Sequence, residues 1–163
     1  MKTLLIVWHS RTGAARAMAQ AAAQAAAAEA EVGTRVVAAE AAQAQDLLDA
    51  DGFLFVCPEN LASMSGEMKA FFDRTYYPVL DRLRGRPYAA MIAAGSDGEG
   101  AARQIARIAT GWRLRQVAEP LIVGTQAQTP EAILAEKTLS AEALAPCAEL
   151  GQALAAGLAL GVF

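Results

Sequence analysis

The chain has 163 residues, enough for one α/β domain with its own hydrophobic core and too few for two such domains. Hydrophobic residues make up 55% of the chain and charged residues 19%, which excludes a disordered protein. The net charge of −3 and the lack of a Lys/Arg stripe argue against binding to nucleic acid or to an anionic membrane. We therefore expect a single domain spanning residues 1–163.

The cysteines and the apolar segments bear on where the protein works. Cys57 and Cys147 lack CxxC spacing, and a free thiol at the end of an apolar run is usually buried, so we expect a reduced, cytoplasmic protein. The N-terminal apolar run is too short for a signal peptide, and residues 153–163 are too short to span a membrane. We expect no metal site and no indispensable catalytic acid or base.

Short apolar runs alternate with helix-like segments along the chain. Strands are predicted over 3–8, 34–37, 53–57 and 88–94, with a fifth strand inside 113–123 that Glu119-Pro120 interrupts. Helices are predicted over 14–30, 65–77, 101–110 and 140–160, the last bent or broken at Pro146, with a short helical segment or turn over 46–50. This alternation predicts a doubly wound, five-stranded parallel sheet with helices on both faces. Ligands of such folds bind at the carboxyl ends of the strands.

The loop after the first predicted strand has residue types that suit a phosphate group. Ser10 and Thr12 carry hydroxyls, Gly13 permits a tight turn, and the following helix presents free N–H groups and a positive dipole end. Arg11 either covers the phosphate or meets a phosphorylated cosubstrate from solvent. Helix capping by Ser10 or Thr12 is a competing explanation. His9 has no nucleophile beside it in the sequence and is interpreted as an ordinary loop residue. Neither a P-loop lysine nor GxGxxG is present.

The run Ser10-Arg11-Thr12-Gly13-Ala14-Ala15 resembles the phosphate loop of the flavodoxin family, usually written T/S-x-T-G-x-T. Ala15 replaces the last hydroxyl of that pattern, so one side-chain hydrogen bond to phosphate is lost while the Ala15 backbone N–H remains. Loss of one such bond costs about 0.5–1.5 kcal/mol, which weakens binding without abolishing it.

A second segment, from Pro58 to Arg74, is similar to the region after strand three of flavodoxin-like NAD(P)H:quinone and FMN reductases, including the Trp-repressor-binding-protein-like quinone reductases. It carries Met64-Ser65-Gly66-Glu67-Met68-Lys69, followed by Phe71-Phe72-Asp73-Arg74. The resemblance extends from Lys2 to about Val123. It implies a flavodoxin-like fold with strand order 2-1-3-4-5 that binds FMN.

The resemblance also implies a position for FMN. Residues 59–64 would run along the isoalloxazine ring, and the loop 95–100 would meet its pyrimidine edge. Packing in the core is the alternative for Met64, and helix capping is the alternative for Asp97 or Glu99. Negative charge from Glu59, Asp97 or Glu99 near the ring would lower its reduction potential unless these groups are solvated surface charges. The predicted cofactor-binding residues are Ser10, Arg11, Thr12, Gly13, Ala14, Ala15, Pro58, Glu59, Asn60, Leu61, Ser63, Met64, Gly95, Ser96, Asp97, Gly98 and Gly100.

Three functions follow from these observations. The segment around Met64 and Gly66 favours an FMN-containing reductase that takes electrons from NAD(P)H and reduces a quinone, a flavin or a similar small acceptor. A flavodoxin-type electron carrier is the second hypothesis, and the mild net charge counts against it. A domain with weak or lost FMN binding is the third, because of Ala15. The resemblance leaves a homodimer open, and residues 126–140 are a lid, a partner contact or a connector.

Overall fold

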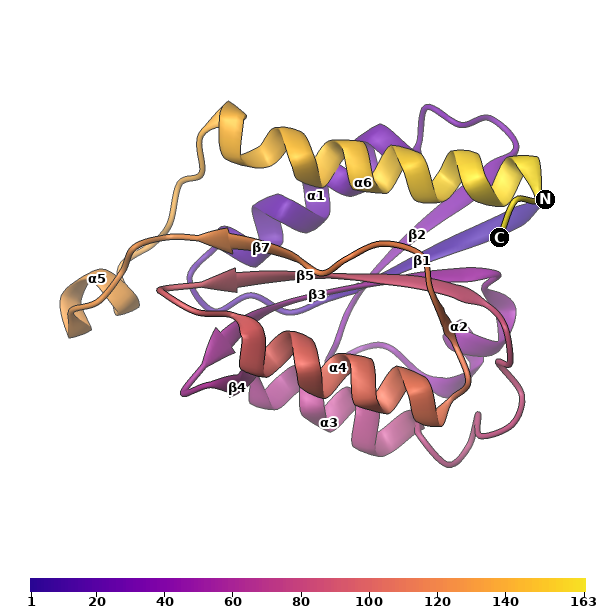
Figure 1. The fold of residues 1–163 in the computed structure, drawn as a ribbon, viewed down its shortest axis with the longest axis horizontal. Helices are drawn as coiled ribbons and strands as arrows, with labels where there is room; N and C mark the ends of the chain where they lie inside the picture. Colours follow the sequence, from indigo (N-terminus) through magenta and orange to yellow (C-terminus); the bar gives the residue numbers. More distant parts are fainter.

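The computed structural model describes residues 1–163 as a parallel sheet between two layers of helices (Figure 1). The strands are β1 (Lys2–Trp8), β2 (Val32–Ala38), β3 (Gly52–Asn60), β4 (Ser63–Met64), β5 (Pro87–Ala94), β6 (Arg115–Gln116) and β7 (Leu121–Gly124). The helices are α1 (Ala14–Ala26), α2 (Ala44–Asp49), α3 (Gly66–Thr75), α4 (Glu99–Gly111), α5 (Pro130–Leu134) and α6 (Ala141–Leu160).

The sheet has the order β2-β1-β3-β5-β6, with β7 also paired to β5. The predicted fifth strand is thus two short pieces, β6 and β7, on either side of Glu119-Pro120, and both run parallel to β5. The order 2-1-3-4-5 expected for the five parallel strands is confirmed. The short strand β4, which the sequence did not predict, runs antiparallel to the end of β3.

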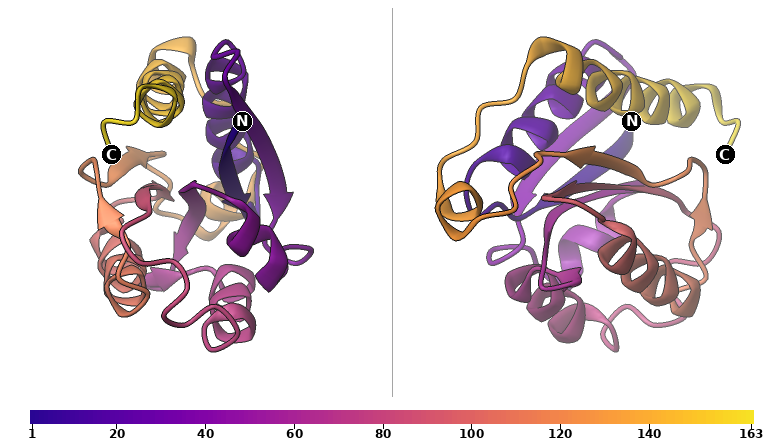
Figure 2. Two further views of the ribbon diagram at one scale, coloured as in Figure 1. Left: turned by 90° about the vertical axis from the view of Figure 1, so that its right-hand side faces the viewer. Right: turned by 60° about the vertical axis from the view of Figure 1, so that its left-hand side comes forward.

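The central strands are buried on both faces. Leu4 and Ile6 of β1 pack with α1 and α6, whereas Leu5 and Val7 pack with α3 and other elements on the opposite face. Helices α1 and α6 cover one face of the sheet, and α2, α3 and α4 cover the other (Figure 2). Burial on both sides explains why the parallel strands appear in the sequence as uninterrupted apolar runs.

The end of one helix differs from the sequence prediction, and a second helix lacks the break that Pro146 suggested. Helix α1 ends at Ala26 rather than Ala30, because the chain turns to place Val32 beside Lys2 in the sheet, and this pairing overrides the helix propensity of alanine. Helix α6 runs unbroken through Pro146. Proline removes one helical hydrogen bond. Further along, α6 packs closely on α1: a Cβ at Gly151 would be 2.2 Å from the Ala22 carbonyl oxygen.

Helix α6 is long and apolar enough to cross a membrane by length and composition, with a mean hydropathy of 1.4 over its most apolar window. A core helix of a soluble protein meets the same criteria. In this fold α6 forms part of a helical layer, and Cys147, Leu154 and Leu158 are buried in the core that it shares with α1 and the sheet.

Candidate functional site

A cavity of about 360 Å³ lies at the carboxyl ends of β1, β3 and β5, where the sequence predicted the site. All three predicted loops contribute to its lining, which is a mixture of apolar and polar residues of the kind found in ligand sites. The predicted residues that line it are Ser10, Arg11, Thr12, Ala14, Ala15, Pro58, Glu59, Asn60, Leu61, Gly95 and Ser96. The other lining residues are Ala62, Ala93, Ala94, Thr125, Ala127, Ile133, Leu134 and Lys137.

The first loop presents free backbone donors to this cavity. Gly13 has φ = +107°, a conformation that favours glycine, and its N–H donates to Ser10 Oγ over 3.0 Å. The backbone amides of Thr12, Ala14 and Ala15 have no protein acceptor. Ser10 therefore fixes the turn before α1, but neither Ser10 nor Thr12 caps the helix, because the N-cap residue is Gly13 and no side chain caps it. The loop nevertheless retains a donor set at a helix N-terminus that fits a phosphate group.

The second loop is the hairpin formed by β3 and β4. Its tip residues Leu61 and Ala62 have φ values of +52° and +64°, the left-handed conformation that two-residue hairpins require and that Asn-Gly usually supplies. Leu61 is fully exposed at the tip. Left-handed backbone at two non-glycine residues is costly, so surrounding contacts must hold the hairpin in place.

Helix α4 provides those contacts. The Glu59 carboxylate accepts hydrogen bonds from the amides of Gly98 (2.8 Å) and Ala101 (3.0 Å), which caps the helix. On the other strand, Gln104 Oε1 accepts from the Met64 amide (2.8 Å) and from Ser63 Oγ (3.1 Å). We call these four hydrogen bonds the hairpin latch.

The hairpin latch changes the interpretation of several predicted cofactor contacts. The Glu59 charge is directed at the N-terminus of α4, so Glu59 is a helix cap as well as a lining residue. Met64 is 3% exposed and belongs to the core, as the packing alternative held, and neither Met64 nor Ser63 lines the cavity. The placement of these two side chains along the flavin ring is therefore not supported by the structure.

In the third loop, only Gly95 and Ser96 line the cavity. Asp97 is exposed, and its Oδ1 accepts from the Glu99 amide at 3.4 Å, a weak capping bond of the kind considered from the sequence. Gly98 donates to Glu59, and Gly100 lies against the hairpin, where a Cβ would be 2.1 Å from the Ala62 carbonyl oxygen. Gly98 and Gly100 thus position the hairpin against α4, and like Gly13 they are not lining residues.

The fourth wall of the cavity is a segment that we call the strap (residues 125–137), for most of which the sequence left open a lid, a partner contact or a connector. It leaves the end of β7, forms α5 beyond the carboxyl ends of β5 and β7, and returns toward α6 (Figure 1). Thr125 N–H donates to the Ala94 carbonyl (2.7 Å), and Lys137 N–H donates to the Thr12 carbonyl (2.7 Å). The helix-start pattern Thr129-Pro130-Glu131, in which Thr129 Oγ1 accepts from the Ala132 amide, was the available signal.

A buried polar pair lies behind β1, on the α3 side. His9 is 8% exposed, and its Nδ1 is 2.8 Å from Ser65 Oγ at the start of α3. Its Nε2 lies 3.4 Å from a Glu67 carboxylate oxygen and 3.7 Å from one of Glu40. His9 does not line the cavity, so it joins β1 to α3 and takes no direct part in the candidate site. The nearby Cys57 thiol is buried, which raises its pKa to about 12.

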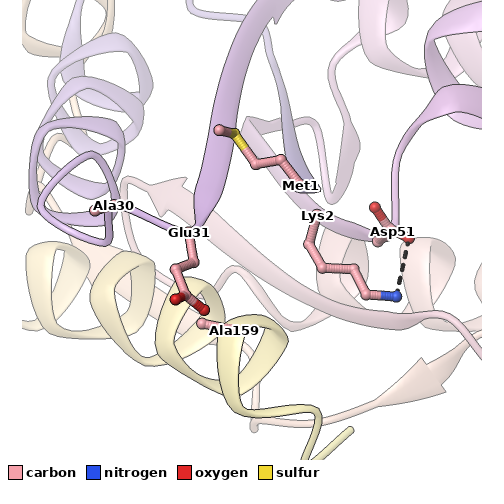
Figure 3. Close-up of a pocket in the computed structure, with 6 residues that line it drawn as sticks. All are labelled: Met1, Lys2, Ala30, Glu31, Asp51 and Ala159. Carbon is pink, nitrogen blue, oxygen red and sulfur yellow. Dashed lines mark hydrogen bonds and ion pairs between the residues drawn. The ribbon is translucent and has the colours of Figure 1, made fainter.

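A second cavity, of about 630 Å³, lies at the opposite end of the sheet, near both termini (Figure 3). Its lining is sparse: Met1, Lys2, Ala30, Glu31, Asp51 and Ala159. The one lysine among them forms an ion pair with Asp51 at 3.5 Å. No set of donors converges on this cavity, so the smaller cavity at the carboxyl ends is the better candidate site.

Comparisons with known proteins support this choice. The model of the family "NADPH-dependent FMN reductase" matches residues 38–128, which is more than half of the chain. That match contains the hairpin, α3, α4, β5 and the beginning of the strap. Comparison with curated protein sequences gives no match.

Solved structures share the fold at low sequence identity. A flavodoxin, WrbA-like protein from Agrobacterium tumefaciens has 16% identity and a TM-score of 0.77 over 99% of both chains. A flavodoxin from the domain Archaea has 19% identity and a TM-score of 0.75, over 96% of this chain and 98% of that one. Rubredoxin oxygen:oxidoreductase from Desulfovibrio gigas has 13% identity and a TM-score of 0.78, over 99% of this chain and 37% of that longer one.

The family match covers most of the cavity-forming segments, and the sheet order and helical layers are those of flavodoxins. The chain is therefore a flavodoxin-like, FMN-binding protein that belongs to the NADPH-dependent FMN reductase family.

Proposed function

We propose that FMN occupies the 360 Å³ cavity and that the protein uses it for NAD(P)H-dependent reduction of a quinone, a flavin or a similar small acceptor. The observation that carries this proposal is the convergence of three loops and the strap on one cavity, with unpaired backbone donors at its β1 end. Family membership supports the choice of cofactor and of electron donor.

The first loop would hold the FMN phosphate. The unpaired amides of Thr12, Ala14 and Ala15 lie at the N-terminal end of α1, where the helix dipole favours an anion. The Ser10 hydroxyl oxygen already accepts from Gly13, and its proton is free to be donated to a phosphate oxygen. These donors fit a terminal phosphate without a metal ion or a P-loop lysine.

The hairpin and the third loop would hold the ring. Pro58 and Leu61 offer apolar surface, and Asn60 offers an amide side chain that both donates and accepts hydrogen bonds. The hairpin latch fixes this wall against α4, so the ring would meet a preorganised surface. FMN, when bound, supplies the redox chemistry, accepting hydride from a nicotinamide and passing electrons on, and the protein supplies binding and orientation.

The mouth of the cavity suits a small apolar acceptor. Leu61, Ile133 and Leu134 line the cavity and are exposed on two separate segments, the hairpin tip and α5. Exposed apolar side chains beside a ligand cavity mark a contact surface for another molecule. No side chain in the cavity is arranged as an obligatory acid or base, which is consistent with chemistry carried by the cofactor.

The test is reduction of the FMN-loaded protein under anaerobic conditions. We expect NADPH or NADH to bleach the visible flavin absorption, and a soluble quinone or free FMN to restore it over repeated turnovers. Protein that binds FMN and stays oxidised under excess NADPH and NADH would refute the reductase proposal.

An electron-transfer protein is the second candidate, because the apolar mouth of the cavity is equally suited to docking a redox partner protein. The same experiment separates the two candidates. A carrier would accept electrons from a reductase protein but not directly from a nicotinamide, whereas a reductase needs no protein donor.

A further inference from the structure

The side chain of Lys137 lies at the phosphate end of the cavity although its position is far from the first loop in the sequence. Its Nζ is 3.4 Å from Thr12 Oγ1, 3.0 Å from the Ile133 carbonyl oxygen and 2.6 Å from the Ala135 carbonyl oxygen. The backbone of Lys137 is fixed as well, because its N–H donates to the Thr12 carbonyl over 2.7 Å. The strap therefore places an ammonium group beside the proposed phosphate loop.

This ammonium has no carboxylate partner. None of the ion pairs in the structure includes Lys137, and its three neighbours are a hydroxyl and two carbonyl oxygens. The only carboxylate that lines the cavity belongs to Glu59, which is bound to the amides of α4. A half-buried cation that lacks a counter-ion and lines a cavity is a site for an anionic group of a ligand.

We propose that Lys137 binds the phosphate of FMN and offsets the hydroxyl that is missing at Ala15, an inference that rests on the proposed function. An ammonium has three N–H donors, of which two are directed at the Ile133 and Ala135 carbonyls. The third makes the longest of the three contacts, 3.4 Å to Thr12 Oγ1, on the loop whose free amides would hold the phosphate, and this donor would turn from the hydroxyl to a phosphate oxygen. The cation thus replaces a neutral hydrogen bond with a charge-assisted one, which is about twice as strong.

A purely structural role for Lys137 makes a different prediction. Bonds from Nζ to the carbonyls at the end of α5 would hold the strap in place whether or not a phosphate is present. Loss of that role would affect every flavin that uses the cavity. Loss of a phosphate contact affects only flavins that carry a phosphate.

Riboflavin, which has the same ring and ribityl chain as FMN but no phosphate, separates these roles. The apoprotein and its variants are titrated with FMN and with riboflavin, and flavin fluorescence gives each Kd. We expect Lys137→Met to raise the Kd for FMN about 10- to 100-fold and to leave the Kd for riboflavin unchanged. Lys137→Arg keeps the charge and should stay within about threefold of the wild type for FMN. Lys69→Met, on an exposed lysine of α3 paired with Asp73, is the matched control and should change neither Kd.

Each outcome decides the question. The phosphate contact is supported if Lys137→Met raises the Kd for FMN but not that for riboflavin, and if Lys137→Arg binds FMN nearly as tightly as the wild type. Equal changes for FMN and riboflavin, or no change for either, overturn it while leaving the proposed function intact. If the wild-type protein binds neither flavin, the proposed function itself fails. Far-ultraviolet circular dichroism confirms that the variants are folded, and Lys137→Gln, which also removes the charge and should also raise only the FMN Kd, replaces Lys137→Met if that variant is not folded.

Discussion

The Glu59 carboxylate at the end of β3 accepts a hydrogen bond from the Gly98 amide at the start of α4 (2.8 Å). The same carboxylate accepts from the Ala101 amide (3.0 Å), so one side chain joins the second and third loops of the candidate site. An acidic residue beside a flavin would ordinarily be interpreted by its effect on the reduction potential. Here its charge is bound to a helix N-terminus, and its main role is structural.

Substitution of Glu59 tests this role. Glu59→Ala leaves the two amides without their partner and should lower the free energy of unfolding by about 1–3 kcal/mol, as seen by urea denaturation. Glu59→Gln retains one carbonyl acceptor and should cost less. Glu149→Gln, at an exposed position on α6 that makes no ion pair, is the control and should be neutral. Equal stability of the Glu59→Ala and wild-type proteins would contradict the capping role.

Gly100 should tolerate no side chain. A Cβ at this position would lie 2.1 Å from the Ala62 carbonyl oxygen, so Gly100→Ala must push the hairpin away from α4. We expect a loss of about 1–3 kcal/mol in stability and weaker FMN binding. Gly66→Ala is the matched control, because a Cβ there meets nothing within 4 Å and alanine stabilises the start of α3. If both alanine variants bind FMN equally well, the close contact between Gly100 and the hairpin does not shape the cavity.

Ser65→Ala should destabilise the protein more than its small change in volume suggests. It removes the hydroxyl that lies 2.8 Å from His9 Nδ1 and leaves a buried ring nitrogen without a partner. Thermal or urea unfolding should show a loss of about 1–3 kcal/mol. Ser63→Ala removes a more exposed hydroxyl bound to Gln104 and should cost less than about 1 kcal/mol. Similar losses in the two variants would mean that the His9–Ser65 pair contributes little.

The buried thiol of Cys57 should make the protein sensitive to alkali. Burial raises the pKa of this thiol from 9.0 to about 12, so the folded state holds the proton at a pH where the unfolded chain releases it. Its contribution to the free energy of unfolding is fully present below pH 9 and is lost as the pH rises from 9 toward 12. Burial raises the pKa of Cys147 to about 11, in the same direction.

Two measurements check this behaviour. A thiol reagent at pH 8 should label Cys57 slowly in the folded protein and rapidly in urea, because the reactive form is the thiolate. Cys57→Ala should be less stable at pH 7 but should lose stability less steeply above pH 9 than the wild type. An identical alkaline slope in the variant would show that Cys57 does not cause the decline.

Local sequence patterns predicted the strands of the sheet well, but they predicted the ends of the helices less well. Runs such as that of β1 are apolar throughout because both faces of the sheet are covered, and the loops that follow these strands must meet at one edge. The end of α1 was misplaced because pairing of Val32 with Lys2 is a tertiary contact that local helix propensity cannot anticipate.

Tertiary contacts also explain why parts of the candidate site were not predicted from the sequence. The hairpin was not predicted because Leu61-Ala62 lacks the residues that usually mark such a turn, and the turn is held by contacts with α4. Met64 was predicted to contact the flavin ring. In the structure it pairs with Glu59 between β3 and β4, and its side chain is buried in the core. The contribution of the strap to the cavity was not predicted because Lys137 and Thr12, which it brings together, are 125 residues apart.

This long sequence separation has a consequence for biosynthesis. The ribosome makes Lys137 of the strap 125 residues after Thr12 of the first loop. A nascent chain of which only β1 to β5 has emerged from the ribosome has the first loop and the hairpin but lacks the wall formed by Thr125 to Lys137. The cavity is therefore complete only after the strap has been synthesised, and a ligand that needs all four walls binds only from that point on.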